Sequence, residues 1–226
     1  DTFRYDTSTG ITTRISVGSG GLQGDRWAEI FWLAGGQYTS GDGRYTVFTS
    51  AAPNLDATDT NNIMDVYRYD TTTATTVRVS GTGNTGRFGG GWAIQPAISA
   101  DGNWVAYETG FSDLLQADTN MIRDVYVQSL KTGSIKSVSF DRFGSPGGFW
   151  RNGAQDAAIS GDGRYIAFAS DNPDLVSGDN NGAQDVFVHD QTTGITQRVS
   201  VATGGGEGNA GSWRPWISGD GNIVVF

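Results

Sequence analysis

The stretch Ile-Ser-Gly-Asp-Gly-Arg-Tyr-Ile-Ala-Phe, residues 159–168, decides the fold because versions of it recur along the whole chain. Its Asp-Gly pair recurs at residues 42, 101, 162 and 220, which gives a period of about 60 residues. An Asp that opens an apolar run keeps the same register, at residues 1, 65, 124 and 185. A turn at Gly10, Ala74, Gly133 and Gly194 is the third landmark. The shared register predicts an array of one repeated module.

Each repeat contains four short segments rich in β-branched and aromatic residues, separated by Gly, Asp, Asn and Thr, which predicts four β-strands. In the third repeat the second strand is expected at 165–168, the third at 186–188 and the fourth at 197–199. No stretch keeps a helical apolar period for three turns. Four-stranded units at this spacing are typical of an all-β β-propeller, with each unit forming one blade.

The quoted stretch, together with Asp-Asn-Asn-Gly-Ala-Gln-Asp-Val-Phe-Val at residues 179–188, resembles the repeats of TolB-like β-propellers of secreted bacterial proteins. The resemblance covers almost the whole chain. It implies a β-propeller fold and a secreted, periplasmic or cell-surface location. It implies little about function, since such propellers serve binding, scaffolding and, with additional domains, hydrolysis.

We expect residues 1–226 to form a single domain, with continuous blades at about 33–80, 93–140 and 155–201. Residues 1–17 correspond to the last two strands of a blade, and residues 213–226 to the first two. Pairing Ile223–Phe226 with Thr2–Asp6 would make a composite fourth blade, close the ring and remove two exposed strand edges. The alternative is a segment of a larger propeller. The chain lacks an initiating Met, so it is expected to be a processed protein or a piece of a longer one.

Composition excludes several classes of function. The chain has no Cys, so disulfides, thiolate zinc sites and Cys nucleophiles are ruled out. Its net charge of −9 disfavours nucleic acid and other polyanionic partners. No apolar run approaches the roughly 20 residues of a membrane helix, so membrane insertion is not expected. The oligomeric state is left open.

The loop before the third strand repeats the pattern Asp-x-Asn-x-x-x-Asp three times. Its members are Asp59, Asn61, Asp65, Asp118, Asn120, Asp124, Asp179, Asn181 and Asp185. Oxygen side chains at this spacing can converge on a hard cation, which predicts up to three structural calcium sites. The pattern departs from an EF-hand loop, which carries Gly at position six and Glu at position twelve. The alternative is that Asp and Asn only cap the turn by accepting backbone N–H groups.

The Gly-rich loops between repeats carry Trp and Arg, residue types that dominate the binding energy of many interfaces. The predicted ligand-binding residues are Trp27, Arg87, Trp92, Trp150, Arg151, Trp213 and Arg214. Up-and-down strand order would place these loops, and the loops between second and third strands, on one face opposite the tight turns. The alternative is that each Trp wedges between adjacent blades as part of the core.

No catalytic constellation is evident. His189 is the only His, so a multi-His metal site is excluded and a Ser-His-Asp triad has little support. We therefore expect a non-enzymatic extracellular binding or structural module that contacts a protein or glycan through the long-loop face. The alternatives are a subunit of an extracellular assembly or filament, and a glycan hydrolase or lyase with carboxylates at the channel mouth.

Overall fold

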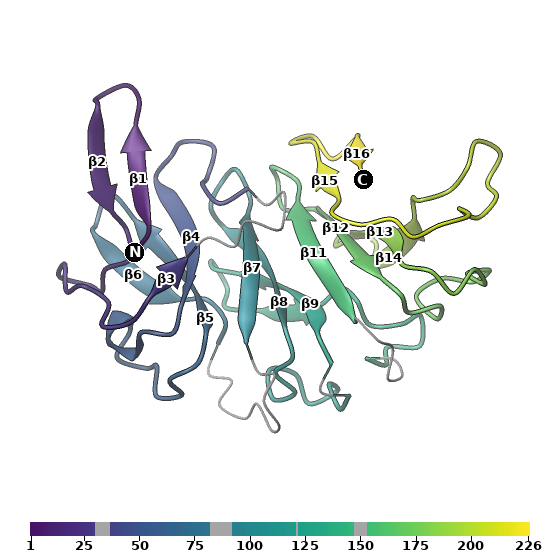
Figure 1. Cartoon of the computed structure of the whole chain (residues 1–226), viewed down its shortest axis with the longest axis horizontal. Helices are drawn as coiled ribbons and strands as arrows, with labels where there is room; N and C mark the ends of the chain where they lie inside the picture. Colours follow the sequence, from purple (N-terminus) through teal and green to yellow (C-terminus); the bar gives the residue numbers. More distant parts are fainter. Residues whose placement is uncertain (30–36, 82–91, 121, 147–152) are drawn as a thin grey trace.

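The computed structural model describes residues 1–29, 37–81, 92–120, 122–146 and 153–226. These residues form β-strands and one short 3-10 helix, η1 (Pro53–Leu55). The strands make three four-stranded antiparallel sheets and two two-stranded sheets within the described part of the chain. Figure 1 shows the sheets side by side in an arc, as blades of a β-propeller stand. The predicted all-β propeller fold is therefore confirmed.

The strand bounds follow the predicted repeats. The first blade is β3 (Ala28–Glu29), β4 (Tyr45–Ser50), β5 (Asp65–Asp70) and β6 (Thr75–Arg78). The second is β7 (Ala93–Ile98), β8 (Trp104–Thr109), β9 (Asp124–Ser129) and β10 (Ile135–Ser137). The third is β11 (Ala154–Ile159), β12 (Tyr165–Ser170), β13 (Asp185–Asp190) and β14 (Ile195–Arg198). The half blades are β1 (Phe3–Asp6) with β2 (Ile11–Arg14), and β15 (Trp216–Ile217) with β16 (Val224–Val225).

The two central strands of each blade hold its core. Tyr107 of β8 lies opposite Tyr126 of β9, and their rings stack with centroids 6.3 Å apart. The first and third blades repeat this pair with centroid distances of 5.7 and 5.8 Å. All six rings are fully buried. Because alternate residues of a strand face the same side, the aromatic at the same position of every repeat builds the same core.

The tight turns link each blade to the next through the backbone. The Gly41 N–H donates to the Ala100 carbonyl, Ala100 donates to Gly161, and Gly161 donates to Gly219, each at 2.8 Å. Each of Ala100, Gly161 and Gly219 is followed two residues later by a glycine with positive φ. These glycines, Gly102, Gly163 and Gly221, each pack against an aromatic ring of the preceding blade. A Cβ on Gly102 would lie 2.2 Å from the Tyr45 ring, for example. We call this series the turn chain; it explains why the Asp-Gly pair recurs.

The two half blades lie at opposite ends of the arc (Figure 1). In the described residues β1 pairs only with β2, and β15 only with β16. The predicted pairing of Ile223–Phe226 with Thr2–Asp6 is therefore absent from this structure. The physical reason is the arc itself, since three full blades set side by side do not turn far enough to bring the two half blades together.

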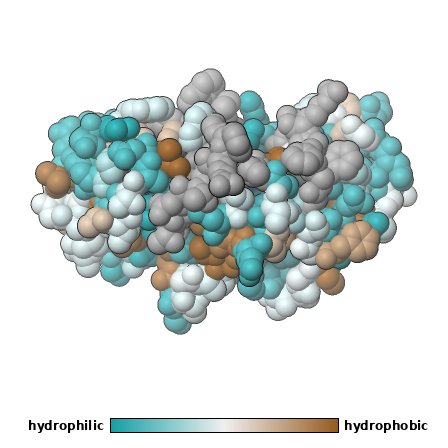
Figure 2. Space-filling model, turned by 90° about the horizontal axis from the view of Figure 1, so that it is seen from below, coloured by the Kyte–Doolittle hydropathy of each residue, from teal (hydrophilic) through white to brown (hydrophobic). Residues whose placement is uncertain are grey.

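Because the strands of each full blade are antiparallel and pair in sequence order, the loop between the second and third strands lies at the end opposite the turn chain, as predicted. Figure 2 views the molecule from below, where hydrophilic residues cover most of the described surface and apolar residues form separate spots. Among the described residues, no helix has the length and apolar character to cross a membrane.

Candidate functional site

The first strands of the second and third blades, and the segment just before β15, share a repeated irregularity. Gln95, Asp156 and Arg214 occupy the same position in successive repeats, and all three have positive φ, at 52°, 60° and 54°. The pairing of β7 with β8 and of β11 with β12 shifts register there, which marks a β-bulge. Bulges re-aim side chains and are frequent next to binding sites.

The three irregular residues line one open pocket of about 560 Å³. We call it the inner-strand pocket; its lining residues are Gln95, Arg123, Gln155, Asp156, Trp213 and Arg214. It lies where the first strands of the blades begin, which is the long-loop side of the molecule. Two guanidinium groups, two amides, one carboxylate and one indole make this a polar pocket with a single aromatic surface.

Glu108 anchors the pocket from inside the second blade. Its side chain is fully buried; one carboxylate oxygen accepts the Asp156 N–H, and the other lies 3.3 Å from Arg123 Nη1. Burial raises the pKa of Glu108 to about 8, although the Arg123 charge acts in the opposite direction. Burial also raises the pKa of Asp156. The carboxyl group therefore connects the second blade to the first strand of the third and fixes two lining residues.

The residues of this arrangement depart from the repeat. Glu108 stands where the other full blades have Thr49 and Ala169, and Arg123 stands where they have Met64 and Gln184. A conserved blade core does not require either residue, so their presence in one blade is a local feature. The sequence analysis missed Glu108, Arg123, Asp156, Gln95 and Gln155. Comparing the repeats position by position could have identified Glu108 and Arg123.

The predicted ligand-binding residues are only partly brought together. Trp213 and Arg214 line the pocket, and Trp213 is 51% exposed. The Arg214 guanidinium is bonded to no other described residue. Trp27 and Trp92 are 59% and 52% exposed but lie outside the pocket lining. These three Trp side chains are therefore not core wedges. Arg87, Trp150 and Arg151 lie outside the described residues.

The Asp-x-Asn loops use their oxygens chiefly to hold the blade together. The last Asp of each loop accepts a hydrogen bond from the Ser that follows the fourth strand, as Asp65 does from Ser80 and Asp185 from Ser200. The first Asp accepts the Tyr67 hydroxyl in the first blade, at 2.6 Å. Turn capping is also present, since the Asn61 N–H donates to Asp59.

Two of the loops also contain a guanidinium. Arg78 Nη1 lies 3.5 Å from Asp59 Oδ1 and 3.5 Å from Asp65 Oδ2. Arg198 Nη1 lies 3.1 Å from Asp179 Oδ1 and 3.4 Å from Asp185 Oδ2. The predicted convergence of the two carboxylates is thus present, with an Arg side chain of the fourth strand between them. Asn61 and Asn181 donate to Asp65 and Asp185, at 3.0 and 2.9 Å.

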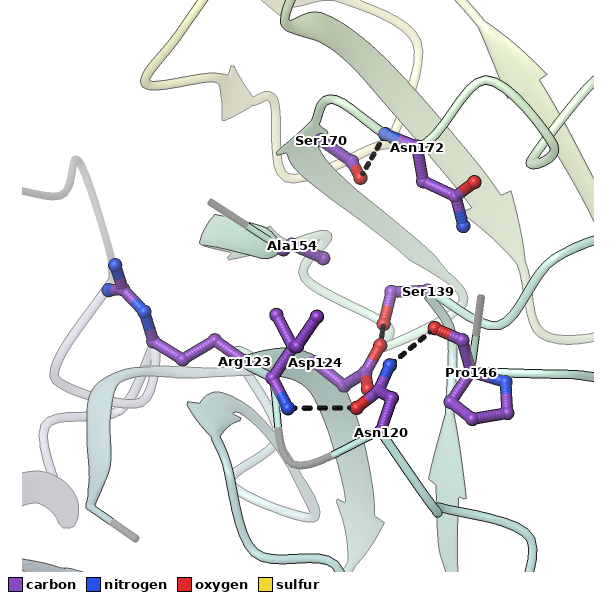
Figure 3. Close-up of a pocket in the computed structure, with 10 residues that line it drawn as sticks. Asn120, Arg123, Asp124, Ser139, Pro146, Ala154, Ser170 and Asn172 are labelled. Carbon is purple, nitrogen blue, oxygen red and sulfur yellow. Dashed lines mark hydrogen bonds between the residues drawn. The ribbon is translucent and has the colours of Figure 1, made fainter. Parts of the chain in front are cut away.

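The loop of the second blade differs in its partners. Tyr126 Oη donates to Asp118 Oδ2 at 2.6 Å, and Ser139 Oγ donates to Asp124 Oδ1 at 2.5 Å. The Asn120 amide donates to the Pro146 carbonyl at 2.6 Å (Figure 3). No Arg reaches these two carboxylates among the described residues. The described part of the chain also holds no group of three or more His, Cys, Asp or Glu arranged for a metal.

The sequence matches no protein-family model and no curated protein. Among solved structures, TolB from Acinetobacter baumannii superposes with a TM-score of 0.54 and 18% identity, covering 98% of this chain and 41% of TolB. The tricorn protease superposes with a TM-score of 0.50 and 14% identity, covering 98% of this chain and 21% of the protease. The chain spans less than half the length of either protein. At these identities the likeness shows the fold alone, a TolB-like β-propeller fold.

Proposed function

We propose that the protein is a non-enzymatic binding module whose inner-strand pocket holds an acidic side chain or terminal carboxylate of a partner protein. The observation that carries this proposal is the pair Trp213 and Arg214 at the pocket. An exposed indole beside a guanidinium that makes no hydrogen bond or ion pair with a described residue is the composition of an interface hot spot. Guanidinium groups bind carboxylates through charge-assisted hydrogen bonds.

The pocket favours a peptide over a neutral glycan. The Arg214 charge acts on the nearby Asp156 carboxylate without forming an ion pair with it, so the guanidinium can still bind the carboxylate of an acidic peptide, which a neutral sugar does not supply. Gln95 and Gln155 can both donate to and accept from a peptide backbone. The rest of the chain is acidic, with a net charge of −9, so the attraction is confined to this pocket. As the resemblance implies, we place the protein outside the cytoplasm.

The burial of Glu108 supports a non-enzymatic role. Glu108 and Asp156 both have raised pKa values, a property of acid catalysts. A general acid must also reach the substrate within hydrogen-bond distance. The Glu108 carboxyl is fully buried, and its two oxygens are engaged by the Asp156 N–H and by Arg123. It therefore acts as an anchor for the pocket, which disfavours the glycoside hydrolase alternative.

We expect Arg214→Ala and Trp213→Ala to weaken binding of acidic peptides at least tenfold, with little loss of stability. The probes are an immobilised random peptide library, a copy with Asp and Glu replaced by Asn and Gln, and a glycan array. Binding to the first and not to the second gives the peptides whose affinities are then measured by calorimetry. Exposed Trp contacts of this kind contribute about 2 kcal/mol or more to binding.

Trp92→Ala is the matched control, because Trp92 is equally exposed and lies outside the pocket lining. It should leave peptide affinity unchanged. If the protein binds neutral glycans on the array and binds none of the acidic peptides, the proposal is contradicted. So would an Arg214→Ala protein that binds the acidic peptides as the wild type does.

A further inference from the structure

The second blade lacks a positive charge that its two neighbours share. In the first and third blades one guanidinium nitrogen lies between the first and last Asp of the loop, within 3.1–3.5 Å of an oxygen of each. Arg14 follows the same rule in the N-terminal half blade, with Nη2 3.8 Å from Asp1 Oδ2. At the corresponding position the second blade has Ser137. A serine side chain is too short and carries no charge, so no cationic side chain of the described residues lies between Asp118 and Asp124.

One carboxylate oxygen of Asp124 lacks a hydrogen-bond partner among the described residues. Its side chain is only 3% exposed, and Oδ2 accepts no hydrogen bond from any described residue. The equivalent oxygens of Asp65 and Asp185 each have an Asn amide and a guanidinium nearby. In the second blade the Asn120 amide donates to the Pro146 carbonyl at 2.6 Å, and it also lies near the Asp124 carboxylate, whose pKa it lowers. A buried carboxylate oxygen without a partner is costly, so this oxygen points to a ligand.

Arg123 does not supply the missing charge, although it directly precedes Asp124. Figure 3 shows its side chain extending away from the Asp124 carboxylate. Its guanidinium lies instead 3.3 Å from the Glu108 carboxylate in the inner-strand pocket. Burial, and in smaller part the Asp118 charge, raise the pKa of Asp124 to about 7. Two buried carboxylates this close together are stabilised by a cation between them.

Room for a ligand lies beside this carboxylate. A cavity of about 10 Å³ is lined by Asn120, Asp124, Ser139 and Pro146, among others (Figure 3). That volume suits one water-sized particle. Its lining combines apolar residues such as Ile122 and Ala154 with carboxylate, amide and hydroxyl groups, and the polar groups can hold a water molecule. The cavity can therefore supply a water ligand to an ion bound at Asp124.

We propose that the second blade binds one calcium-type divalent cation between Asp118 and Asp124, in the place that a guanidinium takes in the first and third blades. Two carboxylates balance the charge of such an ion, and the Ser137 hydroxyl stands where the Arg side chain begins in the other blades. Calcium accepts six to eight oxygen ligands, including waters, so two carboxylates and neutral oxygens can complete its shell. The repeat thus carries one cation site, and its other copies are filled by Arg.

The Ser137→Arg variant tests the site directly, because it restores the residue that the other blades carry. The chelator-treated wild-type chain is titrated with calcium chloride by calorimetry and melted in chelator and in calcium. We expect one calcium per chain and a rise in Tm of about 5–10 °C at a hundredfold excess over Kd. Ser137→Arg should weaken calcium binding at least 100-fold and melt higher than the wild type in chelator. Wild-type calcium binding that Ser137→Arg leaves intact overturns the proposal.

The reverse change, Arg78→Ser, should create a second site, so the calcium stoichiometry should rise from one to two. If that variant fails to fold, Ser137→Arg alone decides the question. A wild-type chain that binds no calcium at millimolar concentration also overturns the proposal.

Discussion

Replacing Gly153 with Ala is expected to destabilise the protein by about 3–5 kcal/mol, which corresponds to a loss of about 10 °C in Tm. Gly153 precedes β11 with a φ of +63°, and an added Cβ would lie 2.2 Å from the Arg123 carbonyl oxygen and 2.7 Å from Ile122 Cγ2. The neighbouring Ala154 N–H donates to that same carbonyl at 2.8 Å. The third blade is thus held against the Arg123 loop where no side chain fits. Chemical denaturation and calorimetry measure the effect.

Gly194→Ala is the control that separates backbone strain from steric clash. Gly194 has a φ of +71°, but nothing lies within 4 Å of the position its Cβ would take. The equivalent residue of the first blade is already Ala74, with a φ of +51°. The cost of Gly194→Ala should therefore be about 1 kcal/mol. Equal losses for the two variants would show that β11 can move away from Arg123, contrary to the structure.

Glu108→Ala is the second change expected to have a large effect, with a loss of about 2–4 kcal/mol in unfolding free energy. It leaves the buried Asp156 N–H without an acceptor and removes the carboxylate that holds Arg123, whose own side chain is partly exposed. The inner-strand pocket should lose its shape as well. Glu108→Gln keeps the side-chain volume, so its stability should lie between those of the wild type and Glu108→Ala. A Glu108→Ala protein as stable as the wild type would contradict the anchoring role.

The pH dependence of stability gives a further check on Glu108. Its pKa in the folded protein is about 8, above the ordinary value of 4.5, so the folded state holds the proton more tightly. The contribution to stability is complete below pH about 4.5 and is lost as the pH rises to about 8. With chelator present, the wild-type Tm should fall across this range more steeply than that of Glu108→Gln. Parallel profiles would mean that Glu108 titrates as it does in the unfolded chain.

The fold could be predicted from the sequence because the same strand and turn pattern recurs in every repeat. The Asp-Gly pair requires positive φ and close contact with a neighbouring ring, as Gly102 shows against Tyr45, so its spacing reports the blades directly. The alternation of aromatic residues likewise reports which side of each strand is buried. Ring closure could not be predicted in the same way, because it depends on small rotations between blades that no single residue encodes.

The candidate sites were predictable only in part, because they depend on contacts between distant segments. Trp213 and Arg214 were identified from residue type alone. Glu108 reads as an ordinary strand residue until the repeats are aligned and its partner Arg123 is placed 3.3 Å away. The Asp-x-Asn pattern indicated that the carboxylates lie close together, but it did not show that Arg78 of the following strand, β6, lies between them. The second blade has Ser137 at the position of Arg78 and Arg198, and this difference becomes visible only when the repeats are aligned.

The turn chain joins each blade only to the blades beside it, through one backbone hydrogen bond at each step. Cooperativity in such an array passes from neighbour to neighbour, as in a one-dimensional lattice. Amide protons should therefore exchange with solvent fastest in the two half blades and slowest in the second blade, which is flanked on both sides. The same blade holds Glu108 and the Asp118–Asp124 pair. A change at either of them would alter how strongly the first and third blades are coupled through the second, and Glu108 acts on the third blade directly because it accepts the Asp156 N–H of β11.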